Sequence, residues 1–118
     1  VRSLRATSKL VVAMSPWGYS YEHDLLKTAG PLPDILLGSG PGIGLVGNIS
    51  AGGKTLWIRS FAQGKAMSRI DILAWPEHGN PNFKWTEEQN VRMTLFGLTD
   101  QYQDDQPMLS LMQSLGTD

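Results

Sequence analysis

Apolar and polar residues alternate along the first part of the chain. Between residues 4 and 14, every second position shares one mostly apolar face, whereas Arg5, Thr7 and Lys9 take the other. This period of two is typical of a strand with one buried face. The pattern therefore predicts a strand that ends before Pro16, because proline cannot donate a hydrogen bond to a sheet.

Five later segments also predict strands. They are short apolar or alternating runs that glycine or proline residues separate, over residues 35–37, 43–46, 56–62, 69–75 and 91–98. In the last two, Ile70, Ile72 and Ala74 share one face of the first strand, and the second strand is expected to place three residues inward: Val91, Met93 and Leu95. The turn at residues 63–65 predicts a hairpin-like reversal between the strands on either side of it.

Two segments have the pattern of helices. Ser20 is placed to cap a short helix that runs through Leu26 and ends at Gly30. A second helix is predicted near the C-terminus, where Pro107 suits the first turn. Its apolar residues recur every three or four positions, at Met108, Leu111, Met112 and Leu115. Such a stripe usually seals the core of its own domain, and the alternative is that it forms an interface with a neighbouring subunit.

These elements predict one mainly β domain over residues 1–118. The expected architecture is an antiparallel β-sandwich or a barrel-like sheet, followed by a C-terminal amphipathic helix, and an α+β fold is the alternative. With 41% hydrophobic residues, the chain can bury a core of ordinary size.

Composition narrows the classes of function. Charged residues make up only 18% of the chain, below the roughly 25% of an average domain, and the net charge is −1. The basic residues are dispersed, which argues against nucleic-acid binding. There are no cysteines, so disulfides and thiolate chemistry are excluded. No apolar run approaches the roughly 20 residues of a membrane span.

The glycine-rich segment over residues 38–55 resembles two nucleotide-binding motifs in part. Residues 42–47 match G-x-G-x-x-G, but the residues that follow cannot make the helix that a dinucleotide fold requires. Lys54 and Thr55 stand where a phosphate-binding loop over residues 47–55 would place them, with Asn48 at the position of its first glycine. This alternative requires a helix from residue 56 to residue 67. We therefore favour a structural connector, and nucleotide binding at Gly47–Thr55 is an alternative.

No set of residues points to catalysis or to a cofactor. Residues 22–24 and residues 77–78 combine histidine with carboxylates, but adjacent residues point in different directions, so neither cluster predicts a metal site. No nucleophile elbow selects a serine. We therefore expect a protein that is not an enzyme, with no catalytic residues, no metal and no cofactor.

Aromatic residues gather around one proline-containing loop. The residues concerned are Trp75, His78, Phe83 and Trp85. Exposed aromatic rings in such a loop can stack on a sugar or hold a peptide. The favoured interpretation is that the rings pack the loop onto the core, and a small carbohydrate- or peptide-binding module is the alternative.

Low charge, many glycine turns, four tryptophans and the absence of a catalytic set favour a structural role. The sequence thus predicts a subunit that associates with copies of itself or with other chains in a larger complex. The chain begins at Val1 rather than methionine, which fits proteolytic processing, a trimmed fragment or a gene read from a non-ATG start. Processing and unusual starts are both common in viral genomes. A viral or phage particle component is accordingly the preferred hypothesis within this class.

Overall fold

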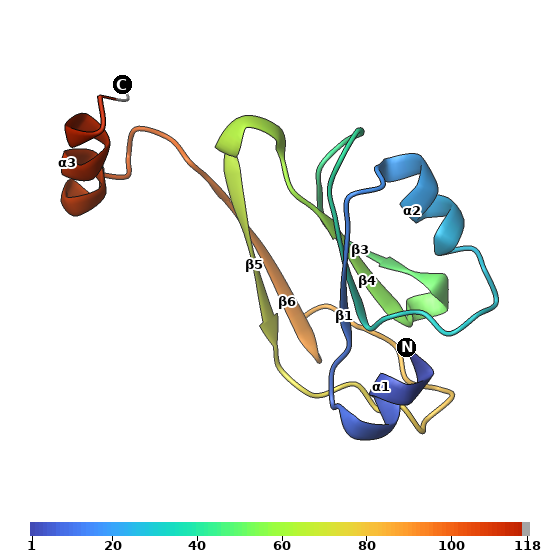
Figure 1. Cartoon of the computed structure of the whole chain (residues 1–118). Helices are drawn as coiled ribbons and strands as arrows, with labels where there is room; N and C mark the ends of the chain where they lie inside the picture. The colour runs from blue at the N-terminus through green and yellow to red at the C-terminus, as the bar shows by residue number, and fades with distance from the viewer. Residues whose placement is uncertain (117–118) are drawn as a thin grey trace.

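The computed structural model describes residues 1–116 and shows an α+β fold (Figure 1). Within these residues the elements follow in the order α1 (Arg2–Thr7), β1 (Val12–Ser15), α2 (Tyr19–Leu25), β2 (Ile35–Gly38), β3 (Leu45–Ser50), η1 (Ala51–Gly53), β4 (Thr55–Arg59), η2 (Ala62–Gly64), β5 (Ala66–Ile72), β6 (Val91–Gly97) and α3 (Gln106–Ser114). The label η denotes a short 3-10 helix.

The larger sheet is mixed, with the strand order β1-β2-β4-β3. β1, β2 and β4 are parallel, whereas β3 runs antiparallel to β4 at one edge. The prediction of an antiparallel sandwich or barrel-like sheet is wrong for this sheet, and no barrel closes in the described part of the chain. The reason is α2, which connects β1 to β2 as a crossover and so allows two short strands to run in the same direction.

The smaller sheet consists of β5 and β6. They pair antiparallel over seven residues, from Ala66 opposite Gly97 to Ile72 opposite Val91. The reversal predicted at residues 63–65 is present as a turn, with a positive φ of 61° at both Gln63 and Gly64. It does not form a hairpin, however, because β4 pairs with β2 and β3 while β5 pairs with β6.

β4 lies at the centre of the fold, and all five of its residues are buried. On one face, Leu56 and Ile58 form a core with the smaller sheet; the other members are Ile35, Trp85 and Val91, with Ile70, Ile72, Phe83, Met93 and Leu10 packed against them. On the other face, Trp57 forms a second core with residues of and after α2; its partners are Leu26, Leu32 and Leu36. β4 is therefore covered on both faces, which explains why its three middle residues, Leu56 to Ile58, are all apolar.

The N-terminal prediction needs a correction. Residues 2–7 form helix α1, and only Val12–Ser15 of the predicted strand pairs as a strand. The guanidinium of Arg5 donates to the carbonyl of Leu32 and to Asp34, and these contacts hold α1 against the segment that precedes β2. Sequence alternation cannot reveal these tertiary contacts.

The two other helices are present where the sequence predicted them. α2 begins one residue before the expected cap, so that Gly18 rather than Ser20 is its N-cap. α3 is capped by Asp105, whose carboxylate accepts from the backbone N–H of Met108. α3 projects from the rest of the molecule on an extended segment (Figure 1). The radius of gyration is accordingly 17.2 Å, compared with about 13.5 Å for a compact domain of this length.

Candidate functional site

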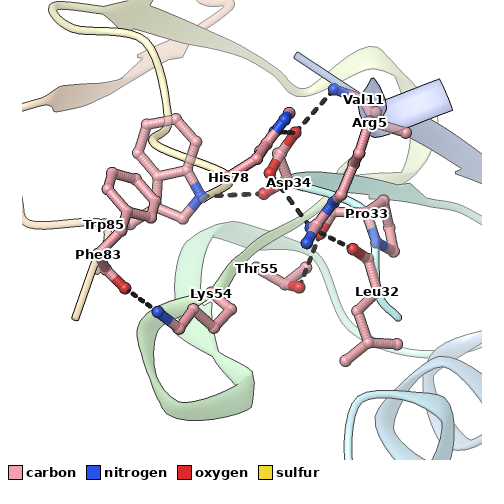
Figure 2. Close-up of polar contacts among 10 residues, drawn as sticks. All are labelled: Arg5, Val11, Leu32, Pro33, Asp34, Lys54, Thr55, His78, Phe83 and Trp85. Carbon is pink, nitrogen blue, oxygen red and sulfur yellow. Dashed lines mark hydrogen bonds and ion pairs between the residues drawn. The ribbon is translucent and has the colours of Figure 1, made fainter. Parts of the chain in front are cut away.

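A buried polar cluster surrounds Asp34, the residue directly before β2 (Figure 2). One carboxylate oxygen accepts from the backbone N–H of Val11 and from Nε2 of His78, at 2.8 Å each, and the other accepts from Arg5 at 3.3 Å. The backbone carbonyl of Asp34 accepts from Nε1 of Trp85 at 3.0 Å. Asp34 thus joins α1, β1, β2 and the loop between β5 and β6. No local sequence pattern identifies Asp34 or Arg5 as members of this cluster, because their partners are distant along the chain.

Lys54 and Thr55 make structural contacts. Nζ of Lys54 donates to the carbonyl of Pro81 at 2.7 Å and to that of Phe83, as Figure 2 shows for the latter. The hydroxyl of the fully buried Thr55 donates to the carbonyl of Pro33 at 2.8 Å. The nucleotide alternative required a helix over residues 56–67. That helix is not formed, since Thr55–Arg59 is the strand β4. The residues therefore lack the strand–loop–helix setting of a phosphate-binding loop.

The first half of the glycine-rich segment wraps around the guanidinium of Arg59. Arg59 is 1% exposed and forms an ion pair of 2.5 Å with Glu22, which is 0% exposed. The remaining donors bind four carbonyls of the loop at 2.8–3.1 Å, those of Ser39, Gly40, Pro41 and Ile43. A phosphate-binding loop turns its N–H groups toward the anion. This loop turns its carbonyls toward a cation, so its geometry supports the connector interpretation.

Glycine is required in this loop by close packing. A Cβ atom at Gly38 would lie 2.0 Å from Oε2 of Glu22, and one at Gly44 would lie 2.6 Å from the ring of Phe61. Gly40 has a φ of 81° and faces the carbonyl of Pro16. Gly38 thus allows the backbone to approach the buried ion pair, whereas Gly40 and Gly44 allow close contacts with Pro16 and Phe61.

Burial would by itself raise the pKa of Glu22, but hydrogen bonds from Trp57, Arg59 and Ser15 and the charge of Arg59 lower it below the ordinary value of 4.5. A carboxylate with a lowered pKa in the folded state stabilises the protein above its ordinary pKa. This contribution is lost as the pH falls below 4.5 toward the pKa of the folded state.

We therefore expect the free energy of unfolding of the parent to fall as the pH is lowered below 4.5. In Glu22→Gln this fall should be smaller, because that variant has no carboxylate to protonate at this site. Chemical unfolding at several pH values measures the difference. Glu88→Gln is the control, since the side chain of Glu88 is 61% exposed and should leave the pH profile unchanged. Equal pH profiles for Glu22→Gln and the parent would contradict this role of Glu22.

The four residues of the predicted aromatic site do not form one exposed platform. Trp85 is 2% exposed and belongs to the core, and Phe83 packs edge-on against it with ring centroids 5.3 Å apart. His78 is bound to Asp34, whereas Trp75 is 56% exposed and lies near Nζ of Lys9. Phe83 and Trp85 therefore have the packing role, and binding of a sugar or peptide at this loop stays a prediction.

Within the cluster at residues 22–24, neighbouring side chains contact different partners. Glu22 points to Arg59, whereas His23 stacks with Tyr19 and Trp57. Among residues 1–116, no three histidine, aspartate or glutamate side chains are placed to hold a metal ion.

The apolar stripe of α3 is exposed to solvent. The exposed fractions are 53% for Met108, 52% for Leu111, 40% for Met112 and 69% for Leu115. None of the residues of Gln106–Ser114 is buried. The favoured prediction, that this stripe seals the core of its own domain, is therefore wrong for the single chain. The interface alternative requires an exposed stripe, which the helix has.

A second apolar surface is a groove of about 550 Å³ between the larger sheet and the start of β5. Ile58 is one of its buried lining residues, whereas Met14, Leu37 and Met67 are 83%, 38% and 55% exposed. These residues come from four strands of two sheets, so no local sequence pattern could have identified the groove.

Comparisons with models of known protein families, with curated proteins and with solved structures found no match. In the described part of the chain no helix is long and apolar enough to span a membrane, in agreement with the sequence.

Proposed function

We propose that the protein is a non-enzymatic subunit of a homo-oligomeric assembly and associates through the apolar face of α3. The observation that carries this proposal is the position of α3, which projects from the domain with its stripe exposed (Figure 1). A projecting helix of this kind has little support from its own domain. Association with another copy would bury its apolar side chains.

The total exposed surface supports the same proposal. The chain exposes 8130 Å², whereas a compact monomer of its mass exposes about 6,350 Å². The excess of about 1,800 Å² is larger than the roughly 800 Å² that each partner buries in a standard interface. The contacts of Lys54, Thr55 and Trp85 favour assembly over the nucleotide- and ligand-binding alternatives. The place of such a subunit in a viral or phage particle stays a prediction.

The proposal is tested with Leu111→Asp. Burial of one leucine contributes about 1.5–3 kcal/mol, and a two-fold dimer contains this position twice. The dissociation constant is therefore expected to rise by at least about a hundredfold, as measured by sedimentation velocity over a range of concentrations.

Ser110→Asp is the matched control. Ser110 is exposed on the same helix and lies about 150° from the centre of the stripe. The Ser110→Asp substitution adds the same charge as Leu111→Asp and should leave association unchanged. Circular dichroism checks that both variants are folded. If Leu111→Asp associates as strongly as Ser110→Asp, α3 is not the interface.

A further inference from the structure

The groove and α3 are both apolar surfaces without charged side chains. The groove is lined only by uncharged residues: Met14, Ser15, Pro16, Leu37, Gly38, Ser39, Ile58, Ser60, Ala66, Met67 and Ser68. The sequence of α3, QPMLSLMQS, also contains no charged residue. An uncharged helix face can enter such a groove without burying an unpaired charge, which is costly.

The charges that flank the two surfaces have opposite signs. Asp100, Asp104 and Asp105 precede α3 in the exposed segment that leads to it. The exposed Lys65 directly precedes Ala66, which lines the groove at the start of β5. A helix in the groove with its N-terminal end near Lys65 would therefore place opposite charges near each other.

We propose that α3 of one copy docks into the groove of a second copy, and that the two copies exchange their helices reciprocally. This inference rests on the proposed function and identifies the surface that receives α3. In this arrangement α3 of one copy covers the groove of the other. Met108, Leu111 and Leu115 of the helix contact Met14, Leu37 and Met67 of the groove.

A second copy of this chain is the occupant because one chain carries both complementary surfaces. The segment over residues 98–105 is exposed throughout and carries α3 away from its own domain (Figure 1). Reciprocal exchange closes a two-fold dimer in which each groove is filled, whereas one-way docking would leave one groove and one helix uncovered. The excess surface of each chain is sufficient for such an interface.

Cysteine cross-linking between two singly substituted chains tests the inference directly. The chain contains no cysteine, so a Leu111→Cys chain and an isotopically labelled Met67→Cys chain each carry one thiol. The chains are mixed, allowed to exchange subunits and oxidised, and the disulfides are identified by mass spectrometry. We expect the mixed disulfide at a yield at least tenfold above that obtained when Ser110→Cys replaces Leu111→Cys.

Three results would overturn the inference. A mixed disulfide no more abundant than with Ser110→Cys would show that the groove does not receive the stripe. Predominant pairing of Leu111→Cys chains with each other would show that α3 packs against α3. A double Met67→Cys/Leu111→Cys variant that closes its disulfide within a monomer would show that α3 docks on its own domain.

The mass of the mixed sample is measured by light scattering before oxidation. A monomer at every concentration would contradict the proposed function itself. An oligomer that forms no mixed disulfide would contradict only the proposed use of the groove.

Discussion

The Arg59→Met variant is expected to unfold with a free energy about 3–5 kcal/mol below that of the parent. Methionine fills part of the space of the arginine side chain but leaves the buried carboxylate of Glu22 without its ion-pair partner. It also removes the donor to four carbonyls of the loop over residues 39–43. Urea denaturation of both proteins measures the difference.

Arg69→Met is the matched control for this experiment. The guanidinium of Arg69 is 63% exposed and forms its ion pair with Asp71 at the surface. Pairs of this kind contribute at most about 1 kcal/mol. A loss of stability in Arg59→Met no greater than that in Arg69→Met would show that the buried ion pair does not organise the loop.

The Gly38→Ala variant is expected to lose stability to a similar extent, by about 3–5 kcal/mol. The added methyl group would lie 2.0 Å from one carboxylate oxygen of Glu22 and 2.8 Å from the other. Either β2 or Glu22 must then move, and the contacts of Glu22 with Arg59 and Trp57 are distorted. Thermal unfolding followed by circular dichroism measures the loss.

Gly30→Ala provides the comparison, because no atom lies within 4 Å of a Cβ atom built at Gly30. Its effect should stay within about 1 kcal/mol and can be stabilising, since alanine restricts the unfolded chain. Equal melting temperatures for Gly38→Ala and the parent would contradict the close packing of β2 at Gly38 against Glu22.

Local patterns in the sequence predicted most elements but not their pairing. The alternation around Ile70 and Val91 identified β5 and β6, and the spacing of Met108 and Leu111 identified α3. Parallel pairing of β1 with β2 depends on the crossover through α2, whereas the chain reaches β4 from β2 by way of the edge strand β3. Strands of four or five residues carry no signal for direction. α1 was missed because its position depends on the contacts of Arg5 with Leu32 and Asp34.

The candidate site could be predicted only in part, for similar reasons. The apolar stripe of α3 was readable from its helical period, whereas its exposure depends on where the preceding segment leads the helix. The groove combines side chains from four strands and could not be seen in any one of them. Arg59 offered one usable signal, a charged residue at the end of an otherwise uncharged buried strand. Such a residue needs a buried partner, but the sequence does not say that the partner is Glu22.

The mass of the parent chain in solution tests the central claim of self-association most directly. Light scattering over a concentration series should give an oligomer that approaches twice the 13.0 kDa of the chain as the concentration rises. A mass of 13.0 kDa at every concentration would contradict self-association through α3.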